Sequence, residues 1–125
     1  MGENEIATLT LDKAFLIHRE LGPGLLESFY ERILSHELEK EGLNVKNQVG
    51  IPFSWGEMKF ENGFRADIVV EEKIIIEVKS FQLIAPVHLK QLMTYLKLTK
   101  LKLGLLLNFN EALLKDGIKR VVNNL

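Results

Sequence analysis

The sequence predicts an α/β protein in which helices flank a mixed sheet. Three observations support this class: apolar residues recur at helical spacing near the N-terminus, three short β-branched segments follow, and a fully apolar segment comes after a helix that a proline opens. The chain has 125 residues and shows no repeat or Pro/Gly-rich linker. We therefore expect one domain over residues 1–125, with one sizeable core.

Two helices are expected before the first strand. The first covers residues 10–21 and ends at the "GPG" of residues 22–24, because glycine and proline interrupt helices. The second covers residues 25–41, and Gly42 is a stop signal at its end. In both, the apolar residues form a stripe that would face the core: Ala14, Ile17 and Leu21 in the first, and Leu26, Tyr30, Ile33 and Leu34 in the second.

Three strands come next. Residues 43–53, 64–70 and 74–79 have the β-branched and alternating character of strands, and residues 55–63 are interpreted as a turn region. Because the three segments are close in sequence, we expect them to pair as an antiparallel meander.

The last part of the chain is expected to add a helix and a strand. Pro86 opens the helix, where its missing N–H costs little, and the helix runs to about Thr99. The apolar segment "KLGLLLNF" (residues 102–109) would then join the sheet through a crossover connection. Residues 113–122 have a weak helical pattern, which predicts a terminal helix.

Composition excludes several classes of protein. There is no cysteine, so neither a disulfide framework nor a thiolate metal site is possible. No apolar stretch approaches the roughly 18 residues of a membrane span, and the N-terminus lacks the pattern of a signal peptide. These features fit a protein of the reducing cytoplasm that has no membrane partner.

Charge is divided unevenly along the chain, although the net charge is only −1. Residues 1–78 carry 8 basic and 15 acidic residues, and residues 79–125 carry 8 basic and 2 acidic ones. An asymmetry of this kind can create a basic surface on a protein that is not basic as a whole. The alternative is a set of solvated lysines on helix surfaces.

Two acids and a lysine interrupt the apolar strands. Side chains alternate across a strand, so Glu77 and Lys79 share one face of segment 74–79 with Ile75. Apolar groups on both faces indicate a strand that is covered on both sides. A charge in such a place survives only with a partner or a metal. The simplest partner would be Lys79 itself, in a structural salt bridge to either acid.

The position of Asp67, on the preceding strand, depends on the hairpin loop. With a two-residue loop (residues 71–72) Asp67 would oppose Ile76, and the two acids would face opposite ways. With a three-residue loop (residues 71–73) Asp67 would oppose Glu77, with the Cβ atoms about 5 Å apart. That separation suits two carboxylates that share one Mg²⁺, a cation held by one or two carboxylates plus water. Three-residue loops favour glycine, and none is present, so both alternatives stay open.

These residues resemble a known pattern. Asp67 followed by Glu77-Val78-Lys79 resembles the core motif of the PD-(D/E)XK nuclease superfamily. Gly24, Glu27 and Tyr30 in "GLLESFY" have the spacing of the GxxExxY family, a branch of that superfamily. Gln91 and Tyr95 resemble the QxxxY element of RecB-like nucleases, and their spacing places both on one helical face.

The resemblance implies a restriction-endonuclease-like fold, with a core of one helix, three antiparallel strands, a helix and a strand. This order agrees with the elements expected above. The sequence also departs from the pattern at three positions. Ala66 precedes the aspartate, Ala85 stands where a hydroxyl residue often caps the helix, and Glu72 stands where a turn glycine is common.

The implied activity is metal-dependent hydrolysis of phosphodiester bonds. Asp67 and Glu77, with the Val78 carbonyl and Glu27, would hold Mg²⁺ or Mn²⁺, and Lys79 would orient the attacking water or stabilise the phosphate. The residues that would bind nucleic acid or position the site are Gln91, Tyr95 and Lys90. The implied partner is nucleic acid, DNA ahead of RNA. The alternative is a module that kept the nuclease fold without catalysis and binds nucleic acid or a protein partner.

Overall fold

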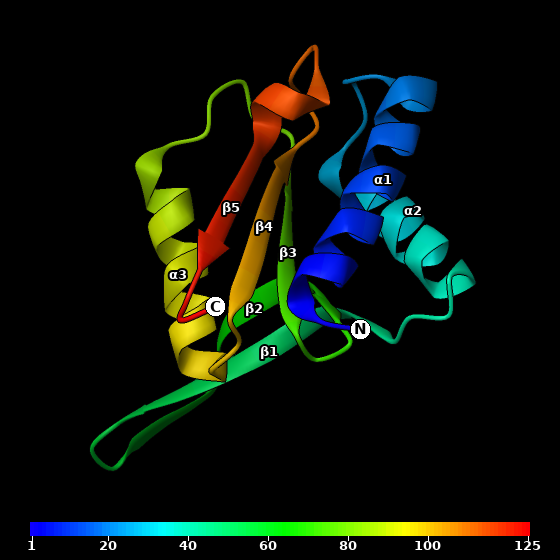
Figure 1. Ribbon diagram of the computed structural model, residues 1–125. Helices are drawn as coiled ribbons and strands as arrows, with labels where there is room; N and C mark the ends of the chain where they lie inside the picture. The colour runs from blue at the N-terminus through cyan, green and yellow to red at the C-terminus, as the bar shows by residue number, and fades with distance from the viewer.

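A computed structural model describes residues 1–125 and shows a five-stranded sheet between two layers of helices (Figure 1). The strand order is β1-β2-β3-β4-β5, so neighbours in the sheet are also neighbours in the sequence. None of the helices is both long and apolar enough to cross a membrane. The elements, in chain order, are α1 (Glu3–Leu21), α2 (Glu27–Lys40), β1 (Val45–Trp55), β2 (Met58–Val70), β3 (Ile74–Lys79), α3 (Pro86–Thr99), β4 (Leu103–Asn108), the 3-10 helix η1 (Leu114–Gly117) and β5 (Ile118–Val122).

The two faces of the sheet have separate cores. Helices α1 and α2 cover one face, where Ile6, Ile17, Tyr30 and Leu34 pack against the even-numbered residues of β3. Helix α3 covers the other face. Its buried residues Leu92, Tyr95 and Leu96 pack there against Ile75 of β3. Because β3 is covered on both sides, five of its six residues are buried.

The mixed topology is confirmed. Strands β1, β2 and β3 form an antiparallel meander, and α3 carries the chain across to β4, which pairs with β3 in parallel. The bounds of β3 and α3 match those expected from the sequence. Ala85 has no hydroxyl to accept an N–H from the first turn of α3, and the side-chain contact at this end runs the other way, from the Ala85 N–H to Nδ1 of His88, at 3.0 Å. Helix α1 begins seven residues earlier than expected, and its added turns bury Ile6 and Ala7.

The β2–β3 hairpin has the three-residue loop. Val70 pairs with Ile74, Val69 with Ile75 and Ile68 with Ile76, which leaves residues 71–73 between the strands. Glu71 and Glu72 have φ angles of 53° and 52°, in the left-handed region that glycine usually occupies. The register therefore settles the alternative left open by the sequence.

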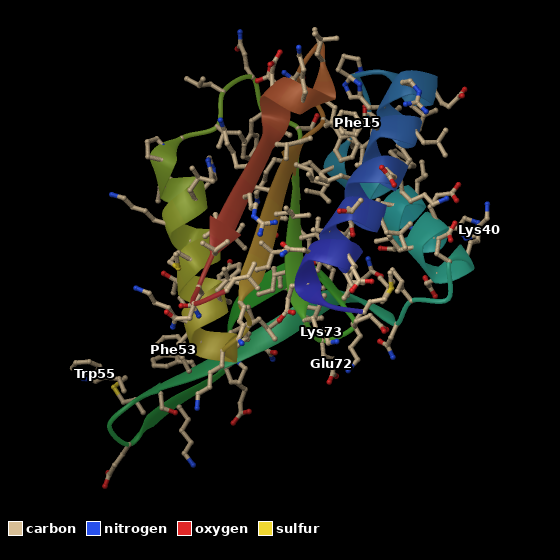
Figure 2. The ribbon with its side chains drawn as sticks, viewed as in Figure 1. Phe15, Lys40, Phe53, Trp55, Glu72 and Lys73 are labelled. Atoms are coloured by element: carbon tan, nitrogen blue, oxygen red, sulfur yellow. The ribbon has the colours of Figure 1, made fainter.

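The interpretation of residues 55–63 as a turn region is wrong. Strands β1 and β2 continue through it as a long hairpin, which turns at Gly56 and Glu57 and extends beyond the helices (Figure 1). The ring of Phe53 stacks on Phe60, with centroids 4.7 Å apart, and this cross-strand contact supports the extension. Figure 2 shows Trp55 near the end of this hairpin, pointing away from the body of the protein.

The expectation of a terminal helix over residues 113–122 is also wrong. Residues Leu114–Gly117 form a single 3-10 turn, and Ile118–Val122 form strand β5, which pairs antiparallel with β4. The segment is rich in β-branched residues, and β4 would otherwise present an unpaired edge. Pairing with that edge therefore outweighs the weak helical pattern.

Candidate functional site

Asp67 and Glu77 lie where β2 and β3 separate. The ladder between the strands ends at the pair Ile68–Ile76, and beyond it β2 crosses away from β3 (Figure 1). Continuing the register by one residue places Asp67 opposite Glu77. Side chains replace the missing ladder bonds there: the Val78 N–H donates to Oδ2 of Asp67 at 2.8 Å, and the Asp67 N–H donates to Oε2 of Glu77 at 3.3 Å. We call this place the fork.

Glu77 occupies an unfavourable environment for a charge. Its side chain is buried, with 5% of the residue exposed. Burial raises the pKa of Glu77 to about 9, and the hydrogen bond to Asp67 and the charge of that group add to the effect. Lys79 lowers the pKa of Glu77 by a smaller amount. Without a cation, Glu77 therefore stays protonated at neutral pH.

Lys79 lies near the acids but is not paired with them. The ion pairs of the chain are Lys13–Glu41, Lys40–Glu37 and Lys46–Glu72, and none includes Lys79. Its Nζ atom lies 5.9 Å from the centre of the Phe81 ring, and the side chain is half-buried. The structure thus gives no support to a structural salt bridge, and the lysine is left available for another anion.

Helix α3 brings Tyr95 to the fork. Tyr95 is buried on this helix, and burial raises the pKa of its phenol, with a further rise from the nearby charges of Glu77 and Asp67. Gln91 lies one turn earlier on the same stripe of the helix, and because α3 runs back along β3, Gln91 lies toward the Lys79 end. Gln91 and Lys90 are exposed, and their side chains make no hydrogen bond.

Glu27 points to the end of β3 rather than into the fork. Its Oε2 atom accepts the N–H of Ser80 at 2.9 Å, one residue beyond Lys79. No group of three or more histidines, cysteines, aspartates or glutamates lies close enough together to hold a metal ion. The structure therefore brings Asp67 and Glu77 together but does not add Glu27 to them as a third acidic ligand.

Tyr30 is part of the core and of the loop before α2. Its ring stacks on Phe109, with centroids 4.4 Å apart. The hydroxyl accepts the N–H groups of Gly24 and Leu25, at 2.9 and 3.1 Å, and donates to the Gly22 carbonyl. Tyr30 thus fixes the "GPG" loop and, with it, the start of the helix that carries Glu27.

Two polar residues near the fork escaped the sequence reasoning. Glu31 is buried on α2 and accepts a hydrogen bond at 2.8 Å from Gln48, whose amide nitrogen also lies 3.4 Å from Oδ1 of Asp67. The only signal for Glu31 was its position one helical turn after Glu27. Gln48 could not be identified from the sequence, because the alternation of a strand does not predict its irregular backbone conformation.

The fork suits a hard divalent cation. Two carboxyl groups in contact, one of them made difficult to ionise by burial and by its neighbour, would both become favourable as anions beside such a cation. The Val78 N–H points into the fork, and in a strand the carbonyl of the same residue points the same way. Two carboxylates, a carbonyl and water are the ligands that Mg²⁺ prefers.

Comparison with known proteins agrees with this geometry. The model of the PD-(D/E)XK nuclease superfamily matches residues 4–121. Searches of curated proteins and of solved structures gave no significant match. The matched segment includes every strand from β1 to β4, helices α2 and α3, all but the first residue of α1, and both acids of the fork. The chain therefore belongs to the PD-(D/E)XK nuclease superfamily.

Proposed function

We propose that this protein is a metal-dependent nuclease that hydrolyses phosphodiester bonds of nucleic acid. The observation that supports this most directly is the contact between Asp67 and Glu77 in the fork, with an unpaired Lys79 beside them. We also propose that it belongs to the GxxExxY branch with a RecB-like QxxxY element, since Gly24 and Tyr30 interact and Tyr95 lies at the fork.

In this proposal Asp67, Glu77 and the Val78 carbonyl hold Mg²⁺ or Mn²⁺. A cation bound there would supply a water of lowered pKa and would neutralise charge on the phosphate. The hydrolytic step joins a water oxygen to phosphorus and breaks the bond from phosphorus to the leaving oxygen. The water gives up a proton, and the leaving oxygen takes one from solvent.

The other residues have positioning or charge-stabilising roles. Lys79 stabilises the extra negative charge on the phosphate, because its ammonium group is close to the fork and has no carboxylate partner. Gln91 and Lys90, which are exposed on α3, position the nucleic-acid backbone, and the buried Tyr95 positions the site from the same helix. Glu27 holds the end of β3 through Ser80 and so sets the position of Lys79.

The test is a cleavage assay on single- and double-stranded DNA and RNA. We expect cleavage with Mg²⁺ or Mn²⁺, none with EDTA, and DNA cut faster than RNA. Replacing Lys79 by Met should lower the rate about 10²–10³-fold, as loss of one charge-stabilising group does in other enzymes. Lys59→Met, at an exposed residue of the long hairpin, is the matched control.

The alternative function predicts a different result. A non-catalytic module would bind nucleic acid, or a protein, and would cut none of the four substrates with any of the cations. In that case Lys79→Met would change no rate, and the nuclease proposal would be rejected.

A further inference from the structure

The backbone of β1 is irregular at the residue that faces the fork. Gln48 has a φ angle of 52°, in the left-handed region, although it lies inside a strand. The residues around it pair regularly with β2, as Asn47–Ile68 and Val49–Ala66, and only the Gln48–Asp67 pair is missing from this stretch. Strain of this kind is held in place by surrounding contacts, and it concentrates at functional sites.

The irregularity has a clear consequence for side chains. Consecutive residues of a regular strand point to opposite faces, so Asn47 and Gln48 should not meet the same group. Here both donate to the Glu31 carboxylate: Nδ2 of Asn47 to Oε2 at 3.0 Å, and Nε2 of Gln48 to Oε1 at 2.8 Å. Asn47 also donates to the Ser35 hydroxyl at 2.7 Å, which ties it to α2.

The Gln48 amide then links two acids. Its NH₂ group has two hydrogens, one directed at Glu31 and the other at Oδ1 of Asp67, 3.4 Å away. If the amide turned over, its carbonyl oxygen would face both carboxylates and repel them. Glu31 therefore fixes the direction of the amide, and the amide in turn faces one oxygen of Asp67 while the Val78 N–H binds the other.

We infer that Glu31 and Gln48 are positioning residues, which hold the Asp67 carboxylate in the orientation that binds a divalent cation. The inference rests on the proposed function, because it assigns a role toward the cation of the same site. Groups that orient a metal ligand from behind commonly change metal affinity 10–100-fold when they are removed. The charge of Asp67 is felt at Glu31, where it adds to burial in raising the pKa of Glu31.

Gln48→Gly separates this role from a role in folding. Glycine adopts a φ of about +50° without strain, so the variant keeps the backbone and loses only the amide. We expect it to melt at or above the wild-type temperature in EDTA and to bind Mn²⁺ about 10–100-fold more weakly in a calorimetric titration without nucleic acid. Glu31→Gln should weaken Mn²⁺ binding by a similar factor, and Glu39→Gln, at an exposed acid of the same helix, should not.

Each outcome decides the inference. Wild-type Mn²⁺ affinity in Gln48→Gly would overturn it, and so would unfolding of that variant in EDTA, which would show that the link serves the fold. If Glu31→Gln does not fold, the decision rests on Gln48→Gly alone. If the wild-type protein binds Mn²⁺ but cuts nothing, the proposed cleavage activity fails, and the Mn²⁺ affinities of the two variants still decide the inference. If the wild-type protein binds no Mn²⁺, both fail.

Discussion

Glu77 is the residue at which the site's electrostatics can be measured without a substrate. Its pKa of about 9 in the folded protein lies far above the usual value of 4.5. Between these two pH values the unfolded chain loses the proton and the folded chain keeps it, so the free energy of unfolding falls as the pH rises. Below about pH 4.5 both states are protonated, and the penalty vanishes.

Glu77→Gln should remove this penalty and abolish cleavage. The amide has the shape of the protonated acid and cannot ionise. In EDTA we expect the variant to melt near the wild-type temperature at pH 5, and above it by a margin that grows up to about pH 9. The measurement is thermal unfolding by circular dichroism across that pH range, and Glu57→Gln, at the exposed hairpin turn, is the control.

Metal ions should reverse the order of the melting temperatures of the wild type and Glu77→Gln. Mn²⁺ should raise the melting temperature of the wild type and leave Glu77→Gln nearly unchanged, because a ligand that binds only the folded state stabilises it. A variant that melts far below the wild type in EDTA would instead indicate that Glu77 is needed, as an anion, to hold the fold. That result, together with no effect of Mn²⁺ on the wild type, would argue against the metal site.

The sequence predicts that Asp67 and Glu77 meet only if the hairpin loop has three residues. Their residue types and spacing can be read from the sequence, but whether they share a face of the sheet depends on the length of that loop. Glu71 adopts a left-handed φ because its backbone N–H donates to the Asn44 carbonyl, and its side chain accepts the Asn44 N–H at 2.7 Å. These contacts join positions 27 residues apart, so local turn preferences could not reveal them.

At the scale of elements, α3 approaches β4 closely, and Gly104 permits this. A Cβ atom at residue 104 would lie 2.8–3.1 Å from three side-chain carbons of Leu92, which is fully buried. Leu92 would have to shift, and α3 carries Gln91 and Tyr95 on either side of it. The distance from α3 to the sheet therefore also sets where these two residues stand relative to the fork.

Gly104→Ala should destabilise the protein by about 1–3 kcal/mol, the usual cost of overpacking a core. Gly24→Ala is the matched control, since its added methyl group would meet nothing within 4 Å and the N–H bond to Tyr30 would remain. We expect the control to stay within about 0.5 kcal/mol of the wild type in urea unfolding. Equal losses in both variants would show that close packing of α3 is not the cause.

The elements that the sequence placed well are those with a strong internal pattern. Segment β3 is a run of β-branched residues, and α3 begins at a proline and buries one apolar stripe, so both were bounded correctly. β5 was missed because its β-branched residues form a segment of only five, which also fits a weak helical pattern, and the free edge of β4 decides between the two. The extended hairpin was missed because Gly56, Asn62 and Gly63 are common turn residues.

For the whole molecule, charge is the property most relevant to a nucleic-acid partner. Residues 79–125 carry half of the 16 basic residues but only 2 of the 17 acidic ones. Lys90 and Lys97 lie on one exposed stripe of α3, and Lys100 and Lys102 follow at its end. None of the four takes part in an ion pair. Helices α1 and α2, on the opposite side of the sheet, hold two of the three lysines that are paired with glutamates, Lys13 and Lys40.

If the α3 lysines contact phosphates, binding should weaken steeply with salt. Each contact adds about 0.9 to the slope of log affinity against log salt for duplex DNA, and about 0.7 for a single strand.

The double variant Lys90→Gln/Lys97→Gln should therefore bind all sequences more weakly and lower the slope by about 1–2. Anisotropy of a labelled DNA, between 50 and 200 mM NaCl with EDTA to prevent cleavage, would measure both quantities over a range in which four phosphate contacts change duplex affinity by about 10²-fold. The control Lys13→Gln/Lys40→Gln removes the same charge from the opposite side of the sheet. It should leave the slope unchanged, because the slope depends on phosphate contacts and not on net charge alone. Equal slopes in the two double variants would place the nucleic acid elsewhere, and an affinity that does not depend on salt would favour a protein partner over nucleic acid.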